Sequence, residues 1–256
     1  MKIIISPAKT MIEDSDTMMA MTEPIFLHKT KEILEYLQTL SYEELKELWG
    51  CNDKIAQLNK ERIDDMKLER GLTPALISYE GIQYQSIGAN VLSQSGWDYL
   101  ENHLRILSGF YGILRPLDGV TPYRLEMQAK ANVDNKGDLY RFWGNLLYEQ
   151  LKKESNVILN LASKEYSKTI EIYRKEEQKQ KKDVMPFVTC IFGEEKNGKV
   201  VQKATMAKMA RGEMVRFLAE NQIEKLEDVK QFNRMNFVFS KEHSKEDQYT
   251  FILEKK

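Results

Sequence analysis

The sequence predicts an α+β protein, a single compact domain over residues 1–256 in which helices flank an irregular mixed sheet. Short β-branched or apolar runs that end in turn residues indicate strands along the chain. Apolar residues at helical spacing indicate helices between them, without the regular strand–helix alternation of a doubly wound fold. The dipeptide Asn197-Gly198 between two apolar runs is a strong hairpin signal. Together these observations favour the α+β class.

In the first half of the chain, the run Lys2–Ile5, ended by Ser6-Pro7, predicts a buried strand. Ser41 and Glu44 form a capping box, which starts a helix that Gly50 ends. Apolar spacing predicts helices over residues 29–40, 41–48, 53–66 and 96–107, and a strand over residues 74–79.

In the second half, Pro116 and Gly119 predict a turn between two short extended segments. Asp138 is placed to cap a helix. The remaining predicted elements are extended segments over 110–114 and 123–127, a helix over 138–151, a strand over 157–161, hairpin strands over 186–194 and 199–204, a helix over 206–221 and a terminal hairpin over 236–240 and 248–253.

The composition is that of a folded, water-soluble protein, with 42% apolar and 30% charged residues. Lys and Arg total 38 against 39 Asp and Glu, so any anion site must be a local concentration of positive charge. The opening MKIIISPAKT is too short for a signal peptide and no segment approaches a membrane span, so we expect a cytoplasmic protein. Two distant cysteines and three scattered histidines predict no disulfide framework, no metal site and no cofactor.

The stretch SGFYGILRPLDGVTPYRLEM, residues 108–127, concentrates turn residues and charges. Arg115 and Arg124 lie beside rigid turns, where a guanidinium can be held in a fixed direction for phosphate or carboxylate recognition. Alternatively, Arg115 pairs with Asp118 and Arg124 with Glu126, and the tyrosines pack over the turn. From these residues alone both interpretations stay open.

Two loops that follow predicted strands could face a ligand. The loop SPAKT, residues 6–10, offers Lys9, a hydroxyl and backbone donors, but it lacks the glycines of a Walker loop. The segment NLASKEY, residues 160–166, offers Ser163, which is more often a helix cap than a nucleophile. On the helix over 206–221, Lys208 and Arg211 lie near one face, beside Gly212, which permits close approach of a backbone or a phosphate. A surface stripe is the favoured interpretation of that face.

The helices over residues 41–66 could form a helix-hairpin-helix subregion, in which backbone N–H groups and nearby basic residues hold a phosphate. Gly50, Lys54 and Lys60 fit this pattern, whereas Asn52 stands where such hairpins usually have a second glycine. Asn tolerates the left-handed conformation better than most residues. An ordinary helical hairpin is the alternative.

In combination, these segments resemble the YaaA family of bacterial peroxide-stress resistance proteins. The matching pieces occur in family order across nearly the whole chain: IISPAKTM (4–11), HLRILSGFYGILRPLDGVTPYRLEM (103–127), LYRFWG (139–144), NLASKEY (160–166) and ARG (210–212). The resemblance implies a positively charged cleft, a helix-hairpin-helix element associated with DNA binding, and a cytoplasmic response to hydrogen peroxide that lowers available iron.

The resemblance carries over Lys9, Arg115, Arg124, Arg141 and Arg211 as site residues, and the hairpin from Gly50 to Lys60. The full set expected to bind DNA phosphates is Lys9, Gly50, Asn52, Lys54, Lys60, Arg115, Arg124, Arg141, Lys208 and Arg211. The expected partner is DNA, bound with structural or weak sequence selectivity and not a membrane.

Two other functions stay open. The protein could instead be an enzyme whose cleft holds a small phosphorylated ligand or nucleotide, with Lys9, Ser163 or Tyr166 acting on that ligand. No pair of residues in the sequence establishes a reaction. A pure protein-interaction module is the third interpretation. Non-catalytic DNA binding that limits iron-dependent oxidative damage is favoured.

Overall fold

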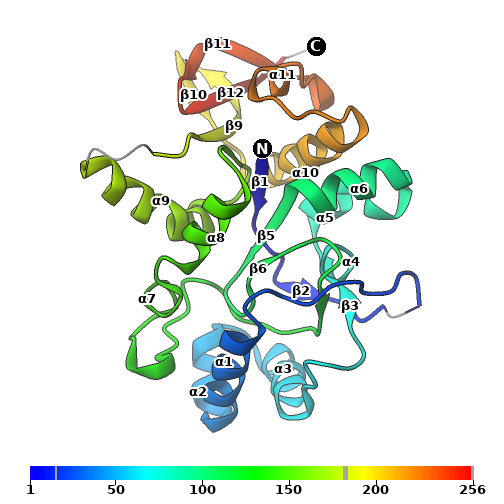
Figure 1. Cartoon of the computed structure of the whole chain (residues 1–256), viewed down its shortest axis with the longest axis vertical. Coiled ribbons are helices and arrows are strands. Elements are labelled where there is room, and N and C mark those ends of the chain that lie inside the picture. Colours follow the sequence, from blue (N-terminus) through cyan, green and yellow to red (C-terminus); the bar gives the residue numbers. More distant parts are fainter. Residues whose placement is uncertain (15, 181–183, 255–256) are drawn as a thin grey trace.

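A computed structural model describes residues 1–14, 16–180 and 184–254, and a mixed sheet crosses its centre (Figure 1). Across the described residues this sheet has eight strands in the order β11-β12-β9-β8-β1-β5-β6, with β10 paired to β9. The strands are β1 (Lys2–Ile5), β5 (Leu104–Ser108), β6 (Gly112–Leu114), β8 (Ile158–Asn160), β9 (Phe187–Lys196), β10 (Lys199–Val201), β11 (Phe237–Lys245) and β12 (Gln248–Leu253).

Five neighbouring strands of this sheet, β5, β1, β8, β9 and β12, run parallel to one another. The mixed sheet flanked by helices is confirmed, but its centre corrects the α+β class to α/β. The sequence pattern concealed this arrangement because the long helical segment between β1 and β5 interrupts the strand–helix alternation. Ile3, Ile4 and Ile5 are fully buried, as expected for a parallel strand covered on both faces.

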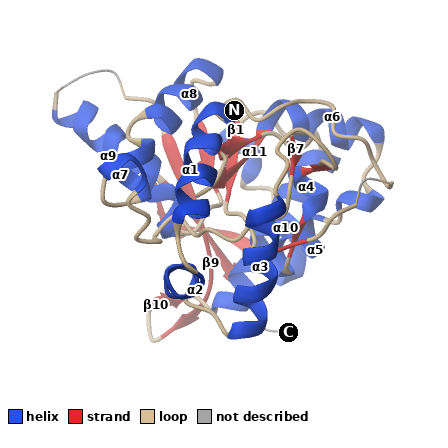
Figure 2. Cartoon of the chain, turned by 90° about the horizontal axis from the view of Figure 1, so that it is seen from below, coloured by secondary structure: helices blue, strands red, loops and turns tan. Residues whose placement is uncertain are grey.

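The helices cover the sheet and extend beyond it (Figure 2). They are α1 (Leu27–Thr39), α2 (Tyr42–Trp49), α3 (Asp53–Asp65), α4 (Ala75–Ser78), α5 (Ile82–Ile87), α6 (Gln94–His103), α7 (Leu139–Trp143), α8 (Leu146–Glu154), α9 (Lys164–Lys179), α10 (Ala204–Glu220) and α11 (Leu226–Val229). Two small ladders join β2 (Thr10–Met11) to β4 (Tyr79–Glu80) and β3 (Thr73–Pro74) to β7 (Gly119–Val120). Helices α1 to α3 lie at the opposite end of the molecule from the hairpin of β11 and β12 (Figure 1).

Several local predictions are confirmed. The Ser41–Glu44 capping box starts α2, and Gly50 ends it in the left-handed conformation with φ 53°. Asp138 accepts a hydrogen bond from the Arg141 N–H and caps α7. The Asn197-Gly198 hairpin and the terminal hairpin also form.

Other boundaries are wrong. The strand predicted over residues 74–79 contains the short helix α4, and residues 123–127 form no strand. The helix predicted over 96–107 ends at His103, because residues 104–108 are fully engaged in the sheet as β5. The helix predicted over 138–151 breaks at Gly144, whose φ is 52°. In each case tertiary pairing or a glycine overrides the apolar spacing.

Both cysteine thiols are free; Cys190 is buried, whereas Cys51 is only partly covered. Among the described residues, no helix combines the length and the apolar character needed to span a membrane.

Candidate functional site

A pocket of about 340 Å³ lies where β1 and β8 end. These strands are parallel neighbours, so the loops that follow them, carrying Ser6 and Ser163, meet at one sheet edge. Across the sheet the five parallel strands lie in the order β5, β1, β8, β9, β12, so β1, the first of them in the chain, lies between the second and the third. The chain adds β5 on one side of β1 and then adds β8, β9 and β12 on the other side, so the order of strands reverses between β1 and β8. Ligands of open α/β sheets characteristically bind at this switch point.

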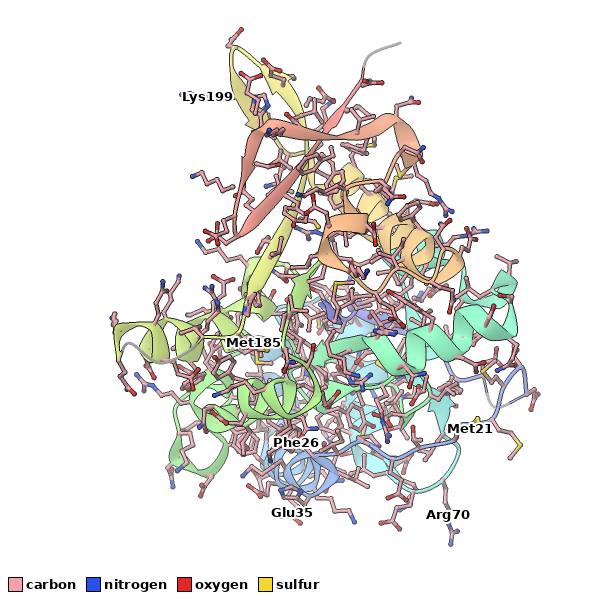
Figure 3. All side chains as sticks on the ribbon, turned by 45° about the horizontal axis from the view of Figure 1, so that its top comes forward. Met21, Phe26, Glu35, Arg70, Met185 and Lys199 are labelled. Atoms are coloured by element: carbon pink, nitrogen blue, oxygen red, sulfur yellow. The ribbon has the colours of Figure 1, made fainter. Side chains whose placement is uncertain are left out.

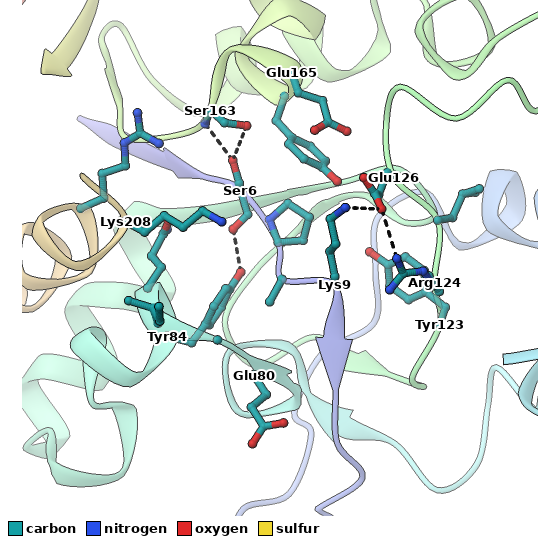
Figure 4. A pocket seen from close by; sticks show the side chains of 18 residues that line it. Ser6, Lys9, Glu80, Tyr84, Tyr123, Arg124, Glu126, Ser163, Glu165 and Lys208 are labelled. Carbon is teal, nitrogen blue, oxygen red and sulfur yellow. Dashed lines mark hydrogen bonds and ion pairs between the residues drawn. The ribbon is translucent and has the colours of Figure 1, made fainter. Parts of the chain in front are cut away.

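Hydrogen bonds hold the two loops together at the floor of the pocket (Figure 4). The Ser163 N–H donates to Ser6 Oγ at 2.8 Å, and Ser6 Oγ donates to Ser163 Oγ at 3.1 Å. The Tyr84 hydroxyl donates to the Ser6 carbonyl at 2.9 Å. Ser163 does occupy the N-cap position of α9, but its side chain makes no capping bond. The hydroxyl predicted as a cap is instead part of the pocket.

Lys9 and Arg124 share one carboxylate on one wall of the pocket (Figure 4). Lys9 Nζ lies 2.8 Å from Glu126 Oε1, and an Arg124 terminal nitrogen lies 3.6 Å from the same oxygen. The predicted pairing of Arg124 with Glu126 is confirmed, and Arg124 also lines the pocket. Arg124 Nε is buried without a hydrogen-bond partner.

Helix α10 supplies Lys208 and Arg211 to the opposite wall. Figure 4 shows Lys208 pointing from α10 toward the loop that carries Ser6. Arg211 Nε is buried without a hydrogen-bond partner, and burial lowers the pKa of its guanidinium. The surface-stripe interpretation is therefore wrong for Arg211.

Gly212 allows α10 to approach the backbone of α5. A Cβ at this position would overlap the carbonyl oxygen of Gln83 and would lie 2.7 Å from Ser86 Cβ. The close approach predicted at Gly212 is thus made by a backbone. It sets the position of the adjacent Arg211 side chain in the pocket.

The central stretch forms a hydroxyl network under the pocket. The Tyr123 hydroxyl lies 2.7 Å from the Tyr79 hydroxyl and 2.6 Å from Ser108 Oγ. A Cβ at Gly109 would lie 2.7 Å from the Leu125 carbonyl oxygen, so only glycine lets these backbone segments meet. Burial raises the pKa of Tyr123, which keeps the network neutral. The bends in this stretch therefore fix the wall from which Arg124 projects.

Two of the predicted arginines lie outside the pocket. Arg115 donates from Nε to Asp118 Oδ1 at 3.1 Å and from its backbone N–H to Asp118 Oδ2 at 2.8 Å. The pairing of Arg115 with Asp118, which the sequence offered as the alternative to ligand recognition, is therefore confirmed. The Arg141 side chain is 75% exposed, and its Nε lies 3.9 Å from Asp138.

The hairpin between α2 and α3 lies apart from the pocket. The Gly50 N–H donates to the carbonyls of Lys46 and Glu47, so it is already engaged within the helix end. Asn52 has a φ of −75°, outside the left-handed region, and its Oδ1 accepts the Ile55 N–H at 3.0 Å as a helix cap. Of the two predicted lysines on α3, Lys54 is exposed, whereas Lys60 pairs with Asp64 at 2.6 Å.

A second hollow, of about 650 Å³, connects these two regions. It shares Lys9 and Glu126 with the pocket, and Gly50 and Lys130 line its other parts. We call the pocket and this second hollow together the groove. The groove joins four predicted cations, Lys9, Arg124, Lys208 and Arg211, to the end of α2.

Some pocket residues had no signal in the sequence. Gln83 and Tyr84 come from α5, a helix of six residues that is too short for periodicity to reveal. Glu165 follows Ser163 in the NLASKEY segment, but nothing in the sequence indicated that it faces inward. Burial raises the pKa of Glu165. Among the described residues, no three His, Cys, Asp or Glu side chains are grouped to hold a metal ion.

Comparisons with known proteins agree on one family. The family model described as "Peroxide stress protein YaaA" matches residues 1–243. A UPF0246 protein of Lachnoclostridium phytofermentans is 53% identical over 252 residues, which cover 98% of this chain and 96% of the relative. UPF0246 proteins of Agathobacter rectalis and Pediococcus pentosaceus are 49% and 48% identical, each with 98% of both chains covered.

Proposed function

The chain belongs to the peroxide stress protein YaaA family, and we propose that it binds DNA phosphates in the groove and thereby limits iron-dependent oxidative damage in the cytoplasm. The observation that carries the proposal is the gathering of Lys9, Arg124, Lys208 and Arg211 along one groove. The net charge of −1 is no obstacle, because counterion release depends on the phosphates contacted locally rather than on total charge.

The groove favours backbone contact over base reading. Its cations come from three parts of the chain, since α10 carries both Lys208 and Arg211 and the other two lie in loops. Lys9, whose side chain is 64% exposed, stands where the pocket meets the second hollow. Contacts of this kind position a protein on DNA but do not read the DNA sequence. At the far end of the groove, the α2–α3 hairpin would supply outer contacts as a helix-hairpin-helix element.

The link to iron follows from the same contacts. Ferrous iron reacts with peroxide to give radicals that damage DNA, and divalent cations belong to the counterion atmosphere of the phosphates. Lysine and arginine side chains that neutralise phosphates release those counterions. A protein bound in this way would lower the amount of iron held at the DNA surface.

The proposal is tested by measuring the affinity of Lys9→Ala and Arg124→Ala for duplex, single-stranded and junction DNA across a salt series. We expect each variant to lose about fivefold to tenfold in affinity at low salt, and the slope of log K against log salt to fall by about 0.9 per lost duplex contact.

Lys199→Ala and Arg70→Ala are the matched controls, since each removes one cation that lines neither hollow. Lys199 lies on the β9–β10 hairpin, and Arg70 lies near the opposite end of the molecule (Figure 3). Undetectable binding of the unaltered protein at low salt would rule out the DNA role. Equal losses in all four variants would show that the groove is not where DNA binds.

Glu126 provides a second test of the same groove. Its carboxylate holds Lys9 and Arg124 in the way that a phosphate oxygen would, and its side chain is only 18% exposed. We expect Glu126→Gln to raise DNA affinity by about threefold to tenfold, because a charge that repels phosphate is removed and two cations are released. The measurement is the same salt series, with Glu80→Gln, a more exposed pocket carboxylate, as the control. Lower affinity in Glu126→Gln would mean that Glu126 serves to position the two cations.

A further inference from the structure

We propose that the inner part of the pocket, between Ser6, Ser163, Lys208 and Arg211, is a binding seat for a phosphate monoester. This seat goes beyond the proposed DNA function, because it would bind a phosphate whether or not a polynucleotide follows it.

The position of the seat in the fold is the first argument. It lies at the switch point between β1 and β8, outside the carboxyl ends of two adjacent parallel strands. In open α/β sheets this crevice holds ligands, and it is where phosphate groups of nucleotides are commonly bound. Here the strand β8 leads directly into α9, a helix of 16 residues whose first turn borders the pocket.

The polar groups of the seat are the second argument. The Ser6 and Ser163 hydroxyls are 3.1 Å apart, and the Ser163 N–H and the Tyr84 hydroxyl fix the loop that carries Ser6. The floor is therefore already organised before any ligand arrives, which lowers the entropic cost of binding. Because the Ser163 hydroxyl bonds Ser6 instead of capping α9, it remains directed toward the pocket.

The distribution of charge is the third argument. On the outer wall, Lys9 and Arg124 already have Glu126 as an anionic partner. On the inner wall, the structure gives Arg211 no carboxylate partner among the described residues, and its Nε is buried without a hydrogen bond. A buried Nε–H without an acceptor is costly, and a bound phosphate would satisfy it. Lys208 adds a second cation, so the seat matches the two charges of a monoester better than the single charge of a phosphodiester.

The size of the pocket limits what can carry the phosphate. About 340 Å³ is at the lower end of ligand pockets and suits a group of the size of one nucleotide or a sugar phosphate. The monoester could therefore belong to a free small molecule or to the 5′ end of a DNA strand. Both offer the same dianion to the seat.

The seat is tested by calorimetric titration of the intact chain with inorganic phosphate, adenosine 5′-monophosphate and adenosine. We expect phosphate and the monophosphate to bind and adenosine not to bind. Arg211→Ala should weaken binding of the monophosphate by about tenfold or more, as expected for loss of a charge-assisted contact. Arg216→Ala is the matched control, because Arg216 lies on the same helix but pairs with Glu220 outside the pocket.

Ser163→Ala is a second variant, in case Arg211→Ala fails to fold, because it removes only a hydroxyl. It should weaken binding of the monophosphate by about threefold to tenfold. Equal binding of adenosine and its monophosphate, or no binding of either, overturns the seat. So does a folded Arg211→Ala that binds the monophosphate like the unaltered protein. Each of these results can occur with DNA binding intact, so failure of the seat is distinguishable from failure of the proposed function.

Two oligonucleotides that differ only in a 5′-phosphate or a 5′-hydroxyl identify the source of the phosphate. Tighter binding of the phosphorylated strand, lost in Arg211→Ala, supports the seat and assigns it to DNA ends. Equal binding of the two strands, with the free monophosphate still bound, supports the seat as a small-molecule site.

Discussion

Gly212→Ala is expected to destabilise the protein by about 3 kcal/mol or more, at the upper end of the cost of overpacking. The new methyl group would overlap the Gln83 carbonyl oxygen, which is backbone and cannot rotate away as a side chain can. Helices α5 and α10 would have to separate along their contact. The shift would also move Lys208 and Arg211, so the variant should lose phosphate and DNA affinity along with stability. Urea denaturation monitored by circular dichroism measures the change.

Gly96→Ala is the matched control, because it makes the same change within another helix, α6, where the nearest atoms to a new Cβ lie at an ordinary 3.5 Å. We expect this variant to be neutral or up to about 1 kcal/mol more stable, from the higher helix propensity of alanine. A Gly212→Ala protein as stable as Gly96→Ala would show that α10 can shift away from α5 without cost.

Local signals in the sequence specified most of the elements but not their arrangement. The run Lys2–Ile5 and the Ser41 capping box both form as predicted, because each depends on neighbouring residues alone. The parallel pairing of β1 with β8 depends on residues about 150 positions apart, and the spacing of apolar residues along the chain cannot predict such a pairing. Without that pairing, the loops carrying Ser6 and Ser163 could be suspected singly as ligand-facing but could not be placed at one sheet edge.

Arg115 and Arg124 show the same limit within one stretch. Both lie beside turns and looked equivalent in the sequence, yet only Arg124 lines the pocket. The difference arises because Asp118 is fully buried beside Arg115 and requires its donors, whereas Glu126 lies at the edge of the pocket. Of the five residues that the resemblance carried over, Lys9, Arg124 and Arg211 line the pocket, whereas Arg115 and Arg141 lie outside it.

Asp118→Ala is expected to cost about 2–4 kcal/mol of stability, because it removes a fully buried acceptor from three donors, each worth about 1 kcal/mol or more. Asp118 is fully buried, and its carboxylate accepts hydrogen bonds from the Arg115 backbone N–H, the Arg115 guanidinium and the Thr22 hydroxyl. The Thr22 bond, 2.7 Å long, links the N-terminal segment to the central turn across 96 positions of the chain. Burial raises the pKa of Asp118, and the hydrogen bonds from Arg115 and Thr22 oppose that shift. Removing the carboxylate leaves these donors without their acceptor, and denaturant unfolding measures the loss.

The control for Asp118→Ala is Asp64→Ala, which breaks the surface pair with Lys60 and should cost less than about 1 kcal/mol. Arg115→Ala should also be destabilising, and combining it with Asp118→Ala should cost less than the sum of the two, because both changes remove the same interaction. Arg115 lies outside the groove, so a folded Arg115→Ala should keep its DNA affinity and salt slope while Arg124→Ala loses both. A strictly additive double variant, or a loss of DNA affinity in Arg115→Ala equal to that in Arg124→Ala, would contradict the structural role assigned to Arg115. Either result would mean that Arg115 and Arg124, nine positions apart in one stretch, share a single function. Their different partners in this fold argue against that, since Arg115 pairs with Asp118 and Arg124 with Glu126.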